Sequence, residues 1–502
     1  MQDAKKGILN VIYGFLGQVV IICLGIVIPR LVLVRYGSEV NGLLNSVTQI
    51  FTCFSLLEAG VGIASLQALY APVANGDREK IQGIMAATHR FYRKTGILYA
   101  LAVAILAFAY PFIVDSDIPY WTIVGIIMFG GLANCINFFY QGKYKILMQA
   151  EGYNYISINI TTLVNVLTSL AKVVLLLLGY NVLAVQFSFF VINLLQMAVY
   201  GIYIHKRYAW IDLKAEPDEK AISQKNATLV HQVSSLIFSN TDALLLTLIT
   251  RDLKIVSIYT MYNMVIAMAT NMIQQVEGGF GFMLGQRYNT DRENYFVLHH
   301  IFEILYLVLV FAVMTTIYVF LLPFMRLYTA EINDASYIHT IYPLLFVLTP
   351  LLTYGRTAAN NIINYAGHFR QTQWRAILES AINIAVSVVG IWKLGIPGAL
   401  LGTIAASLYR TNDIILYAYK YLIHDKPWRT YMRWLASFAV FGIVVFCIPV
   451  DMPYFDSYLK LIAGGCVFGV GSVLVYTLVQ TAINPREMKT AFALIRDYIK
   501  KG

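Results

Sequence analysis

The sequence predicts an all-helical protein that crosses a membrane many times. Of its 502 residues, 58% are hydrophobic and 13% are charged, about half the charged fraction of an ordinary soluble domain. The mean hydropathy of +0.64 and the gathering of polar residues into short clusters indicate repeated segments of membrane-spanning length. This composition excludes a soluble enzyme, a secreted disulfide scaffold and a disordered chain.

Apolar stretches long enough to cross a bilayer, about 20 residues each, lie between charged or turn-rich breaks. The first follows Lys5 and Lys6 and has no small-residue cleavage site, so it is expected to be an uncleaved helix and not a signal peptide. About fourteen spans are predicted, at residues 8–33, 40–70, 95–114, 120–148, 153–178, 181–204, 226–249, 255–283, 296–322, 338–365, 372–393, 396–422, 432–449 and 459–482.

The basic residues are distributed as a topology signal. With the N-terminus placed inside, the inner segments hold 27 of the 37 Lys and Arg residues and the outer segments hold 7. Because Lys and Arg accumulate on the cytoplasmic side, both termini are expected in the cytoplasm. The net charge of +10 therefore does not indicate a nucleic-acid partner. The five cysteines are scattered singly, without metal-ligand spacing, so no metal site is predicted.

One longer connection divides the predicted helices into two sets. It spans residues 206–225, contains Pro217 and is charged at both ends. We therefore predict an N-lobe at 1–205 and a C-lobe at 226–424, each with six helices, followed by two extra helices and a basic tail at 425–502. A faint repeat around Gly152 and Gly367 agrees, and repeated halves recur among transporters.

Four spans carry polar residues along one helical face. Hydroxyls and amides on such faces commonly bond neighbouring helices, but Lys172, Asp242 and Arg356 cannot be left facing lipid. These charges favour a hydrophilic cavity, whereas a single buried His231 is more readily explained as a satisfied core residue. The four stripes are Asn41, Asn45, Thr48, Thr52 and Ser55; Thr161, Asn165, Ser169 and Lys172; Thr228, His231, Ser235, Ser239 and Asp242; and Thr349, Thr353, Arg356 and Asn360.

Other charged residues in the spans leave two readings open. Glu58 and Glu277 each precede glycines. Each of them is either a protonatable switch or a carboxylate bonded to backbone groups that the glycines leave free. Arg30 and Arg35, near the outer end of the first span, suit either snorkelling to lipid headgroups or binding a phosphate at a cavity mouth. Arg410 and Asp413 are spaced i, i+3 and are interpreted as a pair within one helix.

Three segments carry a resemblance to a known family. VIPRLVLVRYGSEVNGLLNSVTQIF and FSLLEAGVGIASLQALY resemble the first helical hairpin of bacterial polysaccharide flippases. These are the Wzx-type members of the multidrug/oligosaccharidyl-lipid/polysaccharide exporter superfamily. SNTDALLLTLITRDLKIVSIYTMYN is similar to that family's intramembrane aspartate followed by a loop and a tyrosine, here Asp242 and Tyr259. The resemblance covers essentially the whole chain.

The resemblance implies two six-helix bundles that form a V around a cationic cavity in the bacterial inner membrane. It implies a monomeric, non-enzymatic flippase that moves an undecaprenyl-diphosphate-linked oligosaccharide of O-antigen or capsule to the outer leaflet. Such flippases work alongside a polysaccharide polymerase and glycosyltransferases.

The resemblance and the polar stripes together give the candidate residues. Asp242 is the family-matched acid for coupling to H⁺ or Na⁺, and no other cofactor is expected. The candidate coupling or gating residues are Asp242, Glu58, Glu277 and His231. The candidates for the diphosphate and glycan are Arg356, Lys172, Arg30, Arg35, Asn360, Asn45, Asn41 and Asn165.

Two alternatives remain open. A drug or cation antiporter of the same fold would favour an acidic cavity, whereas Lys172 and Arg356 accompany Asp242 here. A membrane polysaccharide polymerase would resemble chains with a large outer loop carrying catalytic Arg or His. The outer loops here are short, the longest running over about residues 323–336, and they hold no acid–base cluster.

Overall fold

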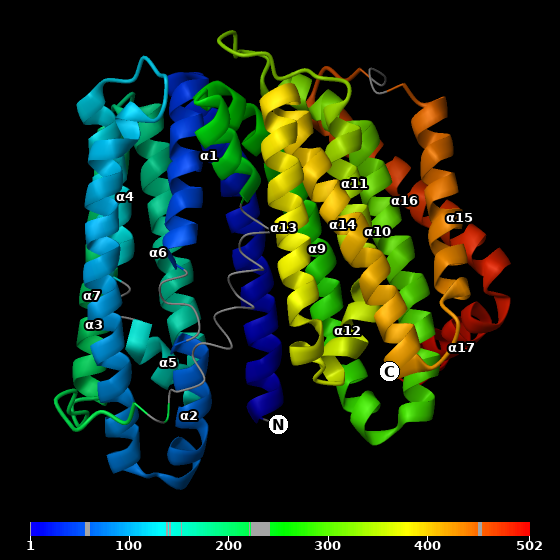
Figure 1. Cartoon of the computed structure of the whole chain (residues 1–502), viewed down its shortest axis with the longest axis horizontal. Coiled ribbons are helices and arrows are strands. Elements are labelled where there is room, and N and C mark those ends of the chain that lie inside the picture. The colour runs from blue at the N-terminus through cyan, green and yellow to red at the C-terminus, as the bar shows by residue number, and fades with distance from the viewer. Residues whose placement is uncertain are drawn as a thin grey trace. The chain divides into compact units, whose positions relative to one another are not determined.

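The computed structural model of the protein is all-helical over the residues it describes (Figure 1). It describes residues 2–55, 61–136, 139, 142–151, 153–219, 221, 241–449 and 454–501. Within these ranges there is no strand, and the one extended pairing is an isolated bridge between Asp115 and Asp252. The predicted all-helical fold is confirmed.

The contacts between residues divide the chain into two compact units, Met1–Ser257 and Ile258–Gly502. The first unit includes a helical segment at residues 241–250 and the first residues of α9. The named helices of this unit are α1 (Gln2–Phe54), α2 (Val61–Asn75), α3 (Arg78–Ala109), the 3₁₀ turn η2 (Tyr110–Phe112), α4 (Tyr120–Ile136), α5 (Gly142–Ala150), α6 (Asn154–Leu177) and α7 (Val182–Arg207).

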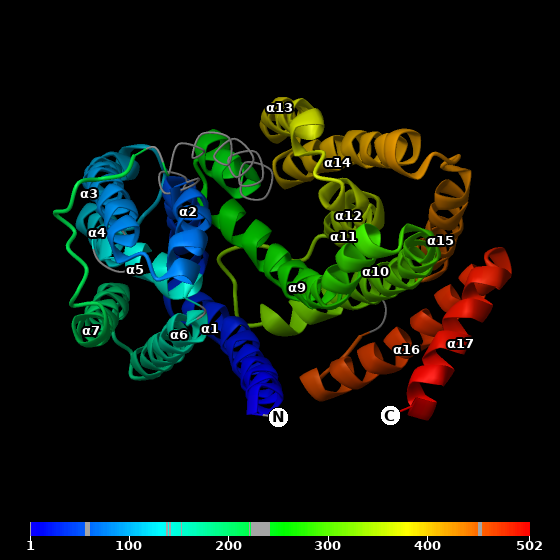
Figure 2. The ribbon, with the colours of Figure 1, turned by 90° about the horizontal axis from the view of Figure 1, so that it is seen from below.

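The second unit contains most of α9 and the remaining helices. Figure 2 shows α13 beside α14 and α16 beside α17. The helices are α9 (Leu253–Thr290), α10 (Arg292–Tyr328), α11 (Tyr342–Gly355), α12 (Thr357–Tyr365), α13 (Phe369–Leu394), α14 (Ile396–Ala418), the π-helical turn η4 (Tyr419–Ile423), α15 (Trp428–Cys447), α16 (Tyr458–Ile483) and α17 (Pro485–Lys501).

Residues 241–257 belong to the first unit because they bond α1. Asn41 donates a hydrogen bond to Ser257 over 2.7 Å, and the hydroxyls of Ser46 and Thr247 lie 2.8 Å apart. A Cβ added at Gly42 would overlap the backbone of Leu253, so only glycine allows this approach. The division of contacts thus falls after Ser257, and the lobe boundaries at 205, 226 and 424 stay predictions.

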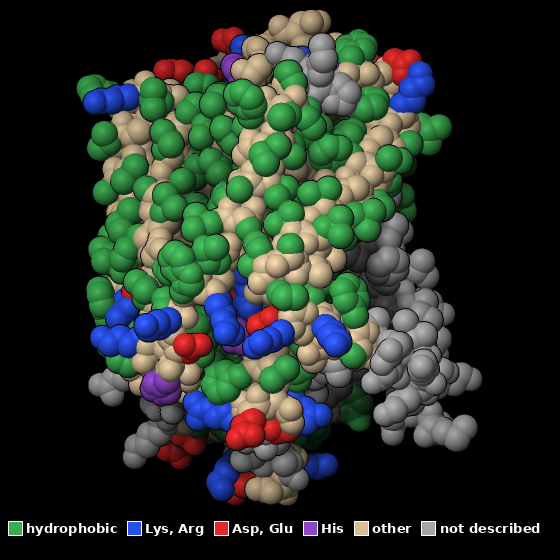
Figure 3. Space-filling model, turned by 90° about the vertical axis from the view of Figure 1, so that its right-hand side faces the viewer, with side chains coloured by type: hydrophobic (Ala, Val, Ile, Leu, Met, Phe, Trp, Pro, Cys, Tyr) green, Lys and Arg blue, Asp and Glu red, His purple; other side chains and the backbone are tan. Residues whose placement is uncertain are grey.

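Eight of the described helices are long and apolar enough to cross a membrane, and the chain is a multi-pass membrane protein. On the face shown in Figure 3, hydrophobic side chains form a broad band, and charged side chains gather below it. Such a band suits contact with lipid, with the charges at the level of the headgroups.

Three predicted segments differ in detail from the structure. The loop expected between residues 33 and 40 is a kink, because α1 resumes directly after Gly37, whose φ of 82° glycine adopts readily. The span predicted at 338–365 is broken into α11 and α12 at Arg356. The tail expected after residue 482 is largely the helix α17.

The described part of the predicted linker lies along the start of α3. The guanidinium of Arg78 is 5.1 Å from the ring centre of Trp210, and Gln82 donates to the Trp210 carbonyl over 2.8 Å. Asp77 caps α3 by accepting a hydrogen bond from the Lys80 backbone N–H, and this bond holds the pKa of Asp77 below its ordinary value. These contacts give residues 206–219 a defined path.

Gly398→Ala is expected to destabilise the protein by about 1–3 kcal/mol, the usual effect of overpacking. Gly390 and Gly398 let α13 and α14 approach backbone to backbone, and a Cβ on Gly398 would overlap the backbone of Gly390. The control is Gly442→Ala, because a Cβ there meets nothing within 4 Å. Denaturant unfolding in mixed micelles measures both. Equal stability of the two variants would contradict the close approach.

Candidate functional site

A polar cavity of about 640 Å³ lies within the first unit. It is lined by residues of α1, α3, α4, α5, α6 and α7. Its lining contains amide, hydroxyl and aromatic side chains. Its polar lining residues are Thr48, Thr52, Ser55, Tyr99, Asn134, Lys145, Thr161, Asn165, Lys172, Gln186, Asn193 and Gln196.

Two of the stripes predicted from sequence face this one cavity. Thr48 and Thr52 come from the end of α1, Ser55 follows that helix directly, and Thr161, Asn165 and Lys172 come from α6. The hydroxyls on α1 also donate to carbonyls of their own helix, as Thr52 does to Thr48 over 2.9 Å. Residues at helical spacing lie on one face, and packing of α6 against α1 turns both faces inward.

Sequence reasoning missed the contribution of α7 to the cavity. Gln186, Asn193 and Gln196 line it, and their spacing of seven and three residues places them on one helical face. The same periodicity that identified the other stripes would have found them. Among the described lining residues, Asn134 is the one polar residue of α4 and Lys145 the one polar residue of α5, so no periodic pattern identifies them and only the packing brings them here.

Lys172 is a basic residue of the cavity, and its ammonium group contacts an aromatic ring. Its ammonium lies 4.9 Å from the ring centre of Phe189, a cation–π distance. No carboxylate is paired with it in the part of the chain that the structure describes. Lys145 lies 5.4 Å from the ring centre of Tyr200. None of the described lining residues is acidic, so the charged side chains of the described lining are all basic.

Asn41 and Asn45 lie closer to the other end of the polar stripe of α1 and bond within the protein. Asn41 is buried and donates to Ser257, and Asn45 donates to the Asn41 carbonyl over 2.8 Å. Neither lines the described cavity. Their contacts are those expected of amides that hold neighbouring helices together.

The candidate carboxylates and the histidine of the coupling set are described only in part. Asp242 is buried in the helical segment 241–250 and has contacts within the protein. His231 and Glu58 lie outside the described residues. Glu277 is half-buried on α9 and accepts from the side chains of Tyr306 and Asn361. Glu277 is therefore bonded to side chains of α10 and α12.

The two arginines near the end of the first predicted span differ in their contacts. Arg35 is exposed, and its guanidinium donates to the Gly179 carbonyl over 3.1 Å at the turn between α6 and α7. The hydroxyl of the adjacent Tyr36 donates to the Tyr180 carbonyl over 2.6 Å. Arg35 thus fastens a turn in this structure. Arg30 is half-buried and has contacts within the protein.

Arg356 lies in the second unit, at the break between α11 and α12, and it is ion-paired. Its Nη2 atom is 2.8 Å from Oε1 of Glu379 on α13. The backbone N–H of Asn360 donates to the Arg356 carbonyl over 3.0 Å, and the Asn360 side chain is half-buried. The sequence identified Arg356 as a cation at bilayer depth. It did not identify Glu379 as the partner of Arg356, because Glu379 lies on a different helix.

A second buried ion pair joins α10 to α15. The carboxylate of Glu303 pairs with the guanidinium of Arg433, and both are almost fully buried, at 4% and 0% exposure. Thr430 donates to Glu303 over 2.5 Å, and Arg433 donates to Asn484 over 2.9 Å. These contacts tie α15 and the start of α17 to α10.

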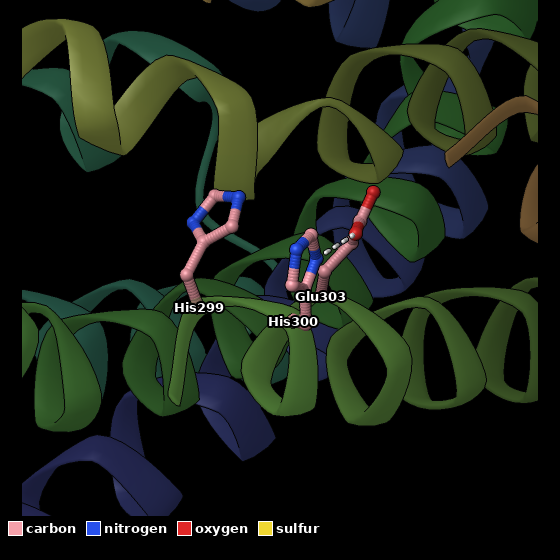
Figure 4. Close-up of side chains that lie close together, drawn as sticks. All are labelled: His299, His300 and Glu303. Atoms are coloured by element: carbon pink, nitrogen blue, oxygen red, sulfur yellow. Dashed lines mark ion pairs between the residues drawn. The ribbon is translucent and has the colours of Figure 1, made fainter. Parts of the chain in front are cut away.

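His299 and His300 lie beside this pair on α10, and Figure 4 shows His300 and Glu303 pointing toward one another. Together with Glu303 they form a group with metal-ligand spacing. However, the guanidinium of Arg433 is already paired with the Glu303 carboxylate, and its Nη1 atom lies 3.2 Å from Nδ1 of His300. A metal cation there would be repelled by the guanidinium, so we assign the group to helix packing.

Comparisons with known proteins identify the fold. No protein-family model matches the sequence, and no curated protein matches it. The solved structure of the lipid II flippase MurJ in an inward closed conformation matches with a TM-score of 0.69 and 13% identity, over 95% of this chain and 100% of that one. An inward-facing multidrug resistance MATE family transporter of the MOP superfamily matches with a TM-score of 0.63 and 14% identity, over 79% and 94%.

The MATE multidrug transporter DinF-BH matches with a TM-score of 0.54 and 12% identity, over 81% of this chain and 93% of that one. These likenesses show that the chain has the fold shared by MurJ and the MATE transporters. This fold agrees with the one that the resemblance implies, and both the superfamily and the polysaccharide-flippase subtype stay predictions. The matching structures are named as a flippase and multidrug transporters, and for this chain a non-enzymatic role stays a prediction.

Proposed function

We propose that the protein is a flippase for a lipid-linked, negatively charged saccharide headgroup. The observation that carries the proposal is the charge of the cavity in the first unit. Its described lining contains Lys172 and Lys145 and no carboxylate. A drug or cation antiporter would need acidic groups in that position, because a cation in a dry cavity must be paired with opposite charge.

The other lining residues suit a saccharide. Asn134, Asn165, Asn193, Gln186 and Gln196 offer amide donors and acceptors for hydroxyl groups. Phe51, Tyr99 and Phe189 add aromatic faces that can cover the apolar faces of sugar rings. The volume of about 640 Å³ lies within the range of about 300–1,000 Å³ for small-molecule sites. The cavity is therefore large enough for part of an oligosaccharide headgroup.

The shared fold supports movement by alternating access, in which a site opens to one leaflet and then to the other. Among the matching structures, one is a flippase of lipid II and others are multidrug transporters. The hydrophobic band on the face shown in Figure 3 suits a protein that lies in the same bilayer as a lipid-linked substrate. We propose undecaprenyl-diphosphate-linked oligosaccharide as the substrate, the bacterial inner membrane as the location and Asp242 as the carboxylate that couples transport to H⁺ or Na⁺.

The test is transport by the full chain in proteoliposomes. We expect it to move a labelled undecaprenyl-diphosphate oligosaccharide from the inner to the outer leaflet and to leave organic cations where they are. Asp242→Asn should keep binding but lose stimulation by an ion gradient. Liposomes without protein are the control. Extrusion of organic cations down a proton or sodium gradient, with the lipid-linked sugar unmoved, would replace the flippase by the antiporter.

A further inference from the structure

Five charged side chains of the second unit alternate in sign. One lies at the break between α11 and α12, and the others lie on α13 and α14. Arg356 pairs with Glu379 over 2.8 Å, and the other oxygen of Glu379 lies 3.4 Å from Nε of Arg410. Asp413 pairs with Arg410 over 2.7 Å and also with Arg375. We call these residues, Arg356, Glu379, Arg410, Asp413 and Arg375, the charge ladder.

The charge ladder has capacity for one more anion. It contains three guanidinium groups and two carboxylates, so one positive charge is not compensated within it. Nη1 of Arg356 and Nε of Arg375 are buried and have no hydrogen-bond partner among the residues that the structure describes. Buried donors without partners are unfavourable, so an acceptor at the Arg356 end would be stabilised.

We propose that the Glu379 carboxylate occupies the position on Arg356 where a phosphate of the substrate headgroup binds. The phosphate then displaces the Glu379 carboxylate from Arg356. This proposal rests on the flippase function above and assigns the diphosphate to Arg356. The guanidinium fork binds carboxylate and phosphate in the same two-pronged way. A diphosphate carries more charge and more acceptor oxygens than the Glu379 carboxylate, so it competes effectively for the same nitrogens.

Glu379 can leave Arg356 without being stranded as a buried charge. Arg410 already contacts its second oxygen, and a buried carboxylate is tolerated only when paired. When the headgroup departs, Glu379 returns to Arg356. Glu379 is therefore a positioning residue that acts through Arg356, and its return speeds release of the substrate.

The backbone at Arg356 suits such an exchange. Arg356 lies between two helices, with α11 ending at Gly355 and α12 beginning at Thr357. Thr411 of α14 donates to the Leu352 carbonyl over 3.1 Å, so α11 is held beside the same helix that carries Arg410. A change of partner at Arg356 is thereby coupled to the packing of α14.

The experiment measures binding of farnesyl diphosphate to the full chain in nanodiscs by calorimetry, together with the transport kinetics. We expect Glu379→Gln to bind the probe about 10-fold more tightly, within the usual range for coupling between sites. The KM and kcat for the lipid-linked sugar should fall together, because the substrate is then released slowly. A purely structural role would lower kcat without tightening binding of the probe.

Asp413→Asn is the matched control. It removes the same charge from the charge ladder but leaves the pair between Arg356 and Glu379 intact. Equal tightening by Asp413→Asn would overturn the proposal, and so would tightening that survives in Arg356→Gln/Glu379→Gln. Inorganic pyrophosphate is measured beside farnesyl diphosphate, and the comparison tells whether the phosphate alone or the lipid-linked form is bound.

The outcomes separate this inference from the proposed function. Transport of the lipid-linked sugar with unchanged probe binding in Glu379→Gln would overturn the role of Glu379 and keep the flippase. If the parent chain does not transport the sugar but Glu379→Gln still binds the probe more tightly than the parent, the competition at Arg356 is supported and the flippase function is overturned.

Discussion

Arg433→Ala is expected to lower the free energy of unfolding by about 3–5 kcal/mol, the usual loss when one partner of a buried ion pair is removed. Arg433 is fully buried and contacts Glu303, His300 and Asn484, so its loss leaves the Glu303 carboxylate without its guanidinium. Because these contacts connect α10, α15 and α17, the variant should also loosen the two C-terminal helices. Denaturant unfolding in mixed micelles measures the change.

Arg429→Ala on the same helix is the control for this prediction. Arg429 is 65% exposed and lies 3.7 Å from Glu487, and exposed pairs contribute about 0–1 kcal/mol. The double variant Arg433→Met/Glu303→Met should recover much of the stability, because replacing both partners by apolar groups is often neutral. A loss as small for Arg433→Ala as for Arg429→Ala would show that the buried pair contributes little.

Lys172→Glu is expected to lower the transport of a lipid-linked anionic sugar by at least about 100-fold. Placing two like charges close together costs several kcal/mol of binding free energy, and each 1.4 kcal/mol corresponds to a tenfold change. The substitution puts a carboxylate into a cavity whose described lining has none. It also removes the cation over Phe189. Initial rates in proteoliposomes, at equal amounts of folded protein, measure the effect.

Two further variants make this result specific to the cavity. Lys172→Arg keeps the charge and should retain most of the transport. Lys460→Glu makes the same change of charge at a side chain that is 66% exposed and should leave transport unchanged. Normal transport by Lys172→Glu would mean that the substrate does not enter this cavity and would remove the main support for an anionic headgroup.

Helical periodicity predicted local relations well. It placed Thr161, Asn165 and Lys172 on one face of α6, and the structure places all three at one cavity. It also predicted the pair between Arg410 and Asp413, which is confirmed at 2.7 Å. Both relations lie within one helix, where 3.6 residues per turn fix which side chains are neighbours.

Partners on different helices could not be predicted in this way. Arg356 was predicted to be a cation of the cavity, but its ion pair with Glu379, more than twenty residues further along the chain, was not predicted. Arg35 was a candidate for a phosphate, and its bond to the Gly179 carbonyl was not predicted either. In each case the partner is set by how two helices cross, and the composition of one helix carries no record of its neighbour.

The sequence by itself determined the all-helical membrane class, because apolar segments of this length must leave water and must satisfy their own backbone within a helix. It also determined which residues share a helical face. Only the tertiary structure decided which faces meet. The packing of α1, α6 and α7 places Lys172 at a cavity whose described lining holds no acid, and the fold of the second unit pairs Arg356, between α11 and α12, with Glu379 of α13. The physical reason is that an ionised group in a dry interior is stable only beside a partner, and the fold supplies that partner.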